Sequence, residues 1–170
     1  MKNQRKLNAE IISCIVISML DLLKVKDFDK ISIIEIIEHA GVSRNSFYRN
    51  FKSKEDILVR YIESITDEFI KSASIQVFEV SWTEYIETIL KHMYENRNFV
   101  TLLIKNNKLH LIRNIFDKAI YNRAAGKIDD YHIWFLSGGL FNLHQHWAED
   151  GYKELPKDIA EKFNRVVLGI

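Results

Sequence analysis

The chain has few of the residues that mark several protein classes. Its 170 residues include one cysteine, one proline and six glycines. The single cysteine, Cys14, excludes an internal disulfide and a cysteine-rich zinc site, so we expect a reducing compartment and a thiol that packs as a small core residue. With so little proline and glycine, the chain has few residues suited to the tight turns of β-hairpins. An apolar fraction of 47% is nevertheless large enough for a substantial core.

Long apolar runs are missing as well. Two uncharged stretches, residues 11–20 and 133–143, are much shorter than the roughly 20 residues that cross a bilayer as a helix. Lys2, Arg5 and Lys6 precede the first stretch, but no small-residue cleavage site follows it, so it does not match a signal peptide. We therefore expect a cytoplasmic protein without a membrane partner.

Apolar residues recur at intervals of three and four, which is the period of helices that bury one face. The sequence therefore predicts an all-α fold. Ser32 and Ser43 occupy positions favoured for helix N-caps. Gly126 and Gly151 are placed to end helices, and Pro156 is placed to begin one. The expected helices span residues 6–26, 32–39, 43–50, 54–74, 82–96, 98–106, 108–125, 129–149 and 156–168.

Positive charge is concentrated in the first third of the chain. Residues 1–60 carry 11 Lys+Arg and 8 Asp+Glu, whereas residues 61–170 carry 13 and 15. The segment from Ser43 to Lys54 has four basic residues and no carboxylate. A charge run is most often a solvated helix face, so its meaning depends on the residues around it.

Residues 32–51 predict two short helices joined by a tight turn. Gly41 supplies the backbone freedom that the turn requires. This is the layout of a helix-turn-helix, although a helical hairpin of this kind is also common as a purely structural element. The residues expected to pack between the two helices are Ile36, Ile37, Ala40, Val42, Phe47 and Phe51.

The polar residues of the second short helix and its surroundings then face outward and are candidates for binding double-stranded DNA. Arg44 and Asn45, at the start of that helix, match guanine and adenine respectively through paired hydrogen bonds. Tyr48, Asn50 and Lys54 are expected to reach the DNA backbone, and so is Ser32 at the positive end of the preceding helix dipole. The full set of expected DNA-binding residues is Ser32, Ser43, Arg44, Asn45, Ser46, Tyr48, Arg49, Asn50 and Lys54.

Several segments fit one pattern at consistent spacings, namely an amphipathic first helix from about Leu7 to Leu23, then Ile34–Ile37, Ala40–Ser43, Ser46–Tyr48, Phe51 and Ser53–Leu58. In this pattern the chain resembles the TetR family of transcriptional regulators over its whole length. Phe28–Ile31 and Asn45 depart from the family pattern. The resemblance implies a helix-turn-helix DNA-binding domain of three helices at residues 1–52 and a helical dimerisation and ligand-sensing domain at residues 53–170. It also implies a homodimeric repressor that binds an inverted-repeat operator and is released by an unknown small-molecule inducer.

A second resemblance lies near the end of the chain, in Trp134–Leu140, Trp147, Gly151 and Leu155–Pro156. These residues are similar to the C-terminal domain of TetR proteins of the Firmicutes type, which include dihydroxyacetone kinase regulators. This likeness implies an alternative function, a protein-interaction module or coactivator that senses a protein partner.

The expected helix at residues 129–149 has two apolar stripes, one for the core and one for a symmetry mate. For an isolated helix, the alternative that both stripes are internal core is equally plausible. With the last helix, the second stripe gives the expected dimer interface, consisting of Trp134, Gly138, Phe141, Gln145, Ile159, Phe163 and Val166.

The family resemblance places an inducer pocket among the middle helices, where aromatic residues accumulate. Aromatic helix faces also pack as ordinary core, so both interpretations remain open at this point. The expected lining residues are Tyr85, Leu90, Tyr94, Leu103, Phe116 and Trp134.

Histidines and nucleophiles do not form a recognisable catalytic or metal pattern. His144 and His146 point roughly 200° apart on a helix, so they do not share a face for one ion. The sequence lacks a glycine-flanked serine elbow and a phosphate-binding glycine loop. We therefore expect no metal, no cofactor and no enzymatic activity.

Overall fold

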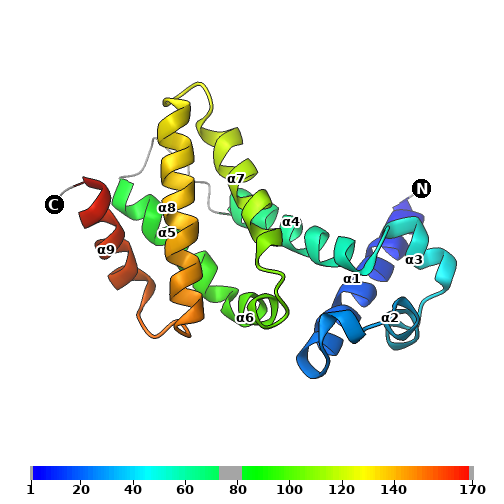
Figure 1. The fold of residues 1–170 in the computed structure, drawn as a ribbon. Helices are drawn as coiled ribbons and strands as arrows, with labels where there is room; N and C mark the ends of the chain where they lie inside the picture. The colour runs from blue at the N-terminus through cyan, green and yellow to red at the C-terminus, as the bar shows by residue number, and fades with distance from the viewer. Residues whose placement is uncertain (1, 73–81, 169–170) are drawn as a thin grey trace. The chain divides into compact units, whose positions relative to one another are not determined.

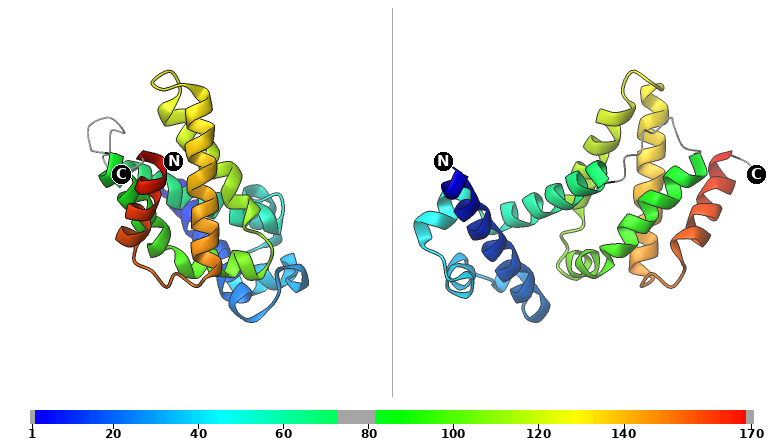
Figure 2. Two further views of the ribbon diagram at one scale, coloured as in Figure 1. Left: turned by 60° about the vertical axis from the view of Figure 1, so that its left-hand side comes forward. Right: turned by 180° about the vertical axis from the view of Figure 1, so that it is seen from behind.

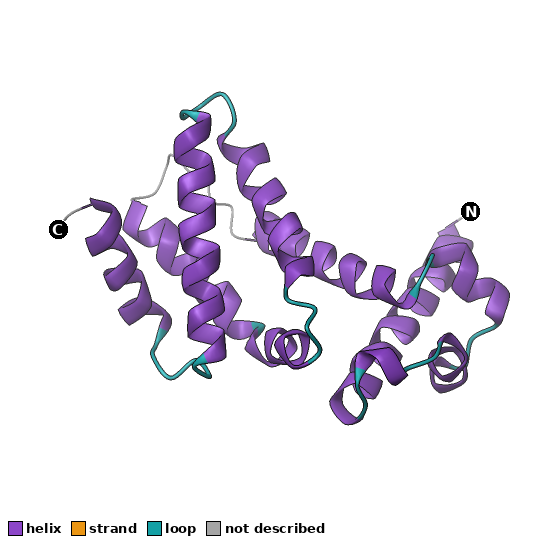
Figure 3. Cartoon of the chain, in the orientation of Figure 1, coloured by secondary structure: helices purple, strands orange, loops and turns teal. Residues whose placement is uncertain are grey.

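The computed structural model describes residues 2–72 and 82–168, and these residues are almost entirely helical (Figure 3). Apart from one bridge contact between Ala125 and Ile128, the described residues contain no β-structure. The all-α prediction is confirmed. The elements are α1 (Lys2–Val25), the 3-10 turn η1 (Phe28–Lys30), α2 (Ile33–Ala40), α3 (Arg44–Asn50), α4 (Lys54–Ser72), α5 (Trp82–Glu95), α6 (Arg97–Lys105), α7 (His110–Ala124), α8 (Asp130–Glu149) and α9 (Pro156–Leu168).

The chain divides into two compact units, Met1–Glu63 and Ser64–Ile170. The division lies inside α4, so the first half of this helix belongs to one unit and the second half to the other. The domain boundary expected from the sequence, after residue 52, lies before the start of α4.

The first unit is a small helical domain in which α1 packs against α2 and α3 (Figure 1). Its core is made of large apolar side chains, which are removed from water and supply the main driving force for folding. The buried residues come from every helix of the unit and include Ile15, Met19, Leu23, Ile36, Phe47, Phe51, Ile57 and Leu58.

Helix ends follow the predicted capping chemistry. The Ser32 and Ser43 hydroxyls accept hydrogen bonds from backbone N–H groups three residues later, so both predicted N-caps are confirmed. Gly126 and Gly151 have left-handed backbone angles of φ 75° and 76° after α7 and α8, a conformation that glycine adopts without strain. Pro156 is the first residue of α9.

The second unit is built around α8, which has α7 on one side and α5 and α9 on the other (Figures 1 and 2). The α5 and α9 helices make extensive contact with one another. The core that these helices share includes Ile86, Leu90, Leu140, Trp147, Ile159 and Phe163.

The Cys14 thiol is exposed, so the expectation that it packs in the core is wrong. The neighbouring residue Ile15 is fully buried instead, because successive residues of a helix point about 100° apart. Among the described residues, no helix is long and apolar enough to cross a membrane.

Candidate nucleic-acid interface and ligand cavity

The α2–α3 hairpin presents a polar helix face on a fixed support. Gly41 ends α2 with φ 64°, which turns the chain into α3. Phe47 is fully buried and its ring meets the Phe51 ring at a centroid distance of 5.9 Å. Because Phe47 holds one side of α3 in the core, the opposite side is oriented toward solvent.

Four of the expected DNA-binding residues lie on that exposed side of α3, namely Arg44, Asn45, Tyr48 and Arg49. The Arg44 guanidinium carbon lies 5.7 Å from the centre of the Tyr48 ring, a cation–π distance. The helix contains no carboxylate. This face therefore offers two positive charges together with amide and hydroxyl groups, and nothing on α3 repels a phosphate.

Ser43 and Ser46 lie at the start of α3 and contact each other. The Ser46 backbone N–H donates to Ser43 Oγ at 3.1 Å, and the Ser43 hydroxyl donates to Ser46 Oγ at 2.9 Å. Both residues thus support the N-terminus of the helix that carries Arg44 and Asn45.

Asn50 lies in the interior, so the expectation that it lies on the exposed end of the second helix is wrong. Only 7% of the residue is exposed. Its side-chain amide exchanges two hydrogen bonds with the Asn8 amide, at 3.0 and 3.1 Å, and donates a third to the Ser46 carbonyl at 2.9 Å. Asn50 follows Phe47 by three residues and shares its buried face, so it joins α3 to α1.

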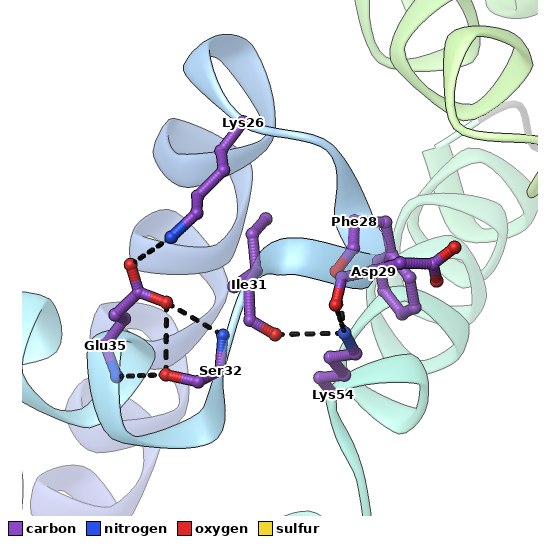
Figure 4. A network of polar contacts seen from close by, with 7 residues as sticks. All are labelled: Lys26, Phe28, Asp29, Ile31, Ser32, Glu35 and Lys54. Atoms are coloured by element: carbon purple, nitrogen blue, oxygen red, sulfur yellow. Dashed lines mark hydrogen bonds and ion pairs between the residues drawn. The ribbon is translucent and has the colours of Figure 1, made fainter.

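Lys54 points into the loop before α2 (Figure 4). Its Nζ donates to the carbonyl oxygens of Phe28, Asp29 and Ile31 at 2.6, 3.2 and 2.9 Å. The Nζ also lies 4.5 Å from the centre of the Phe28 ring. An ammonium group has three N–H donors, and all three are used inside the protein. The Lys54 ammonium group therefore points into the protein and not toward a DNA phosphate, which was its predicted partner.

The start of α2 already holds a carboxylate (Figure 4). Ser32 and Glu35 form a reciprocal capping box, in which the Ser32 N–H donates to Glu35 Oε2 at 2.9 Å and the Glu35 N–H donates to Ser32 Oγ at 3.2 Å. Lys26 Nζ lies 2.5 Å from Glu35 Oε1. The Lys26 hydrogen bond, followed by those from Ser32, lowers the pKa of Glu35 to about 2. A phosphate at Ser32 would therefore meet an ionised carboxylate.

Sequence reasoning missed the contributions of Asn8, Lys26 and Glu35. The capping box had a visible signal, because a serine followed three residues later by glutamate marks a helix start. Asn8 and Lys26 had none, since their partners lie 42 and 9 residues away in the chain.

The expected dimer residues of the second unit are only partly at the surface. Phe141, Ile159 and Phe163 are buried within the chain, so the expectation that they face a partner is wrong. Phe141, at 5% exposure, lies under α7, with the Arg113 guanidinium carbon 4.9 Å from its ring centre. The remaining four residues are Trp134, Gly138, Gln145 and Val166, of which Trp134 and Val166 are exposed.

The exposed face of α8 lies about one residue away from the expected stripe. It contains Tyr131, Phe135, Gly139 and Asn142, which are spaced by four, four and three residues and therefore share one side of the helix. Phe135 is 67% exposed. Neighbouring Trp134 instead stacks on Tyr121 of α7 at a centroid distance of 5.7 Å.

Most of the six expected pocket residues are buried in the second unit or pack against its core. Leu90 and Leu103 are fully buried, and Tyr85 and Phe116 pack against the core of the second unit. Tyr94 stacks on Trp147 at 5.7 Å. A cavity of about 420 Å³ lies elsewhere, lined by Ile104, Asn107, Leu109, His110, Arg113, Phe141, Gln145 and Glu149.

His144 is a polar residue within the core of the second unit. Its Nε2 lies 2.9 Å from the Tyr152 hydroxyl, whereas its Nδ1 has no hydrogen-bond partner among the described residues. Burial, with a smaller contribution from nearby His92, lowers the pKa of His144 to about 4. Burial likewise raises the pKa of the Tyr152 hydroxyl. The ring is therefore neutral at pH 7. His146, by contrast, is exposed.

The sequence matches two family descriptions in order along the chain. Residues 20–61, which include α2 and α3, match "Bacterial regulatory proteins, tetR family", and residues 80–169 match "Transcriptional regulator C-terminal region". The chain belongs to the TetR family of transcriptional regulators. The α2–α3 hairpin therefore lies in the N-terminal helix-turn-helix region of a TetR-family regulator.

This TetR-family chain is similar to known regulators in sequence and in fold. The activator DhaS of the dhaKLM operon in Lactococcus lactis is 27% identical over 118 residues, which are 66% of this chain and 60% of that protein. The match thus spans less than two thirds of the length of DhaS. A TetR regulator from Streptococcus agalactiae has a TM-score of 0.70 at 22% identity, with 98% of both chains covered. A DhaS structure has a TM-score of 0.64 at 16% identity, with 94% of both chains covered.

Proposed function

We propose that this TetR-family regulator is a cytoplasmic homodimeric repressor that binds an inverted-repeat operator and is released by a small-molecule inducer. The observation that carries the proposal is the exposed face of α3, which combines two cations, an amide and a phenol without any acidic residue. Double-stranded DNA is the partner with the matching negative charge and base-edge acceptors. We propose no catalytic role for the chain.

Within this proposal, the exposed residues of α3 have two kinds of contact. Arg44 and Asn45 lie in the first turn of α3, the part of such a helix that reaches base edges in the major groove. Tyr48 and Arg49, further along, are assigned to phosphates, which position the helix without specifying sequence. Ser43 and Ser46 support the start of α3, and Asn50 and Lys54 hold the surrounding helices in place.

A homodimer gives this arrangement its response to ligand. The half-sites of a palindromic operator lie roughly 34 Å apart along B-form DNA. Two α3 helices bind both half-sites only when their separation matches that distance. A ligand that favours a conformation with a different separation therefore weakens operator binding.

The first test is selection of bound fragments from a random duplex pool with the full-length protein. An enriched inverted repeat is the expected result. Failure to enrich any sequence at low salt would overturn the operator-binding proposal.

Substitution of Arg44 tests the assignment of base contacts. Arg44→Ala is expected to weaken binding by about 1–3 kcal/mol at one or two operator positions, because a base contact discriminates between sequences. Arg49→Ala, the matched control on the same helix, is expected to weaken binding evenly over all operator variants. Anisotropy titrations against single-base operator variants measure both effects. An even loss for Arg44→Ala would contradict its base-reading role.

A second candidate function is a coactivator or protein-interaction module that senses a protein partner. The similarity to DhaS, which is named as a transcriptional activator, favours this candidate. The dependence of binding affinity on salt concentration distinguishes the operator-binding repressor from the protein-interaction module. An operator-binding protein loses affinity steeply between about 50 and 200 mM salt, because it displaces counterions from DNA, whereas an apolar protein interface is nearly insensitive.

A further inference from the structure

The cavity beside α8 has the size and construction of a small-molecule site. It lies between the α6–α7 turn, the first half of α7 and the second half of α8, with a volume of about 420 Å³. Pockets of roughly 300–1,000 Å³ typically hold small organic molecules. None of the six residues expected from the sequence to line a pocket belongs to this cavity.

The cavity has an apolar floor and a polar rim. Phe141 of α8 is buried and forms the floor, and Ile104 and Leu109 add aliphatic surface. Asn107 and His110 are exposed at the opening. A ligand that fills this space therefore needs an apolar body and a polar group at one edge.

Arg113 is the cation that lines the cavity, and its orientation is held from behind. Its Nε donates to Asp117 Oδ2 at 2.7 Å, and the second oxygen of Asp117 accepts a hydrogen bond from the Ser137 hydroxyl. The guanidinium carbon lies 4.9 Å from the centre of the Phe141 ring. Among the described residues, its terminal nitrogens Nη1 and Nη2 have no hydrogen-bond partner.

A fixed guanidinium group with two unused nitrogens suits a planar oxyanion. The planar fork of N–H donors matches the two oxygens of a carboxylate. Since Asp117 already offsets the charge of Arg113, the site favours a head group with one negative charge over a doubly charged phosphate. Glu149 lies eight residues after Phe141, about 12 Å along α8, and its carboxylate disfavours a second anionic group at that end of the cavity.

We propose that this cavity binds an organic monocarboxylate with an apolar body, and that Arg113 holds the carboxylate group. The body lies against Phe141, Ile104 and Leu109. The role of this ligand as the inducer rests on the proposed function, whereas binding in the cavity does not require DNA.

Three probes with one body and different head groups test the ligand class. They are 3-phenylpropanoate, 3-phenylpropan-1-ol and 3-phenylpropan-1-amine, each titrated into the full-length protein by calorimetry. The carboxylate is expected to bind at least about tenfold more tightly than the alcohol or the amine, which corresponds to the loss of one charge-assisted interaction. Equal affinity for all three probes, or no binding of the carboxylate, would overturn the proposal.

Variants of Arg113 locate the binding. Arg113→Met is expected to weaken carboxylate binding at least about tenfold, to the level of the alcohol. Because Arg113→Met leaves Asp117 without its partner, the double variant Arg113→Met with Asp117→Asn removes the pair together and is expected to give the same result. Lys118→Met is the matched control, since Lys118 is exposed on the same helix and does not line the cavity. Unchanged carboxylate affinity in both Arg113 variants would refute the assignment.

The outcome for the cavity is separable from the outcome for operator binding. Carboxylate binding without selection of any DNA sequence would leave the cavity proposal standing and overturn the proposed function. Selection of an operator without carboxylate binding would support the proposed function and overturn the cavity proposal.

Discussion

Side chains of the same type have different roles around the helix-turn-helix, and their partners decide which. Asn45 is exposed on α3, whereas Asn50 on the same helix is buried and bonded to Asn8. Lys52 is exposed, whereas the ammonium group of Lys54 is bonded to three carbonyl oxygens. Buried polar groups must be hydrogen-bonded to avoid a large desolvation penalty. The side chains of Asn50 and Lys54 therefore stabilise the fold of the DNA-binding unit.

Lys54→Met is expected to reduce the free energy of unfolding of the first unit by about 2 kcal/mol, because charge-assisted hydrogen bonds to three carbonyls are lost. Lys52→Met removes the same charge without this network and is expected to stay within about 0.5 kcal/mol of the wild type. Circular dichroism in urea measures the change. Tryptophan fluorescence would not report this change, because Trp82, Trp134 and Trp147 all belong to the second unit.

The same variant distinguishes a structural lysine from one that contacts DNA. In Lys54→Met, the slope of log affinity against log salt is expected to equal that of the wild type. A lysine that neutralises a phosphate would change this slope by about 1. A changed slope together with unchanged stability would show that Lys54 contacts DNA.

At the scale of elements, α8 is the helix whose neighbours determine its surfaces. Its sequence has apolar residues on more than one side, and α7 covers Phe141 while Phe135 stays exposed. Phe163 of α9 lies 3.6 Å from the position that a Cβ atom would occupy at Gly139, so Gly139 lies at the border between the exposed face of α8 and the side that packs on α9. The α8 helix therefore uses two sides within the chain and leaves a third face available.

The buried histidine of α8 predicts an acid sensitivity of the second unit. The folded-state pKa of His144 is about 4, below the value of about 6.5 for an unfolded chain. Between these values the unfolded state binds a proton that the folded state does not. His144 therefore does not reduce the free energy of unfolding above pH 6.5. Its titration lowers that free energy by about 3 kcal/mol as the pH decreases to 4.

Tryptophan fluorescence in urea at pH 7, 5.5 and 4 measures this effect, since the Trp147 and Tyr152 rings are 4.9 Å apart. His144→Gln is expected to show a smaller loss of stability than the wild type over this range. His146→Gln, on an exposed position of the same helix, is expected to behave like the wild type. His92, whose pKa burial also lowers, remains in all three proteins. Because His92 also lowers the pKa of His144, the difference reports His144 together with its interaction with His92. An identical pH dependence in wild type and His144→Gln would contradict the assignment.

At the scale of the whole molecule, the proposed regulation requires both units of the chain and a second copy of it. The first unit holds the α3 face, and the second holds the cavity and the exposed face of α8. Twofold symmetry places identical faces of two chains against one another. The α8 face of Tyr131, Phe135, Gly139 and Asn142 is our proposed contact, with Val166 of α9 as a further exposed apolar residue.

Phe135→Asp is expected to convert the proposed dimer into monomers, because it introduces a charge into an apolar contact. Analytical ultracentrifugation at micromolar concentration measures the change, and helical content is expected to stay the same since Phe135 is 67% exposed. Operator affinity is expected to fall by about 100-fold or more with loss of the second binding site. Ile34→Asp, an exposed apolar position in the first unit, is the control and should remain dimeric. A Phe135→Asp protein that stays dimeric would exclude this face.

The sequence by itself determined the helices, their ends and the helix-turn-helix. Apolar periodicity, the caps at Ser32 and Ser43, and the left-handed glycine at Gly41 are local properties, because a helix forms through contacts between residues a few positions apart. The exposed cations of α3 could also be identified, since Phe47 requires the opposite side of a short helix to face solvent.

Only the tertiary structure decided which partner each remaining polar or apolar side chain meets. Asn50 bonds to Asn8, Lys54 to the loop 23 to 26 residues earlier, and Phe141 packs beneath Arg113. The cavity likewise forms from α6, α7 and α8 together. These contacts depend on how helices pack, and a helix with several apolar sides leaves more than one packing open until its neighbours are in place.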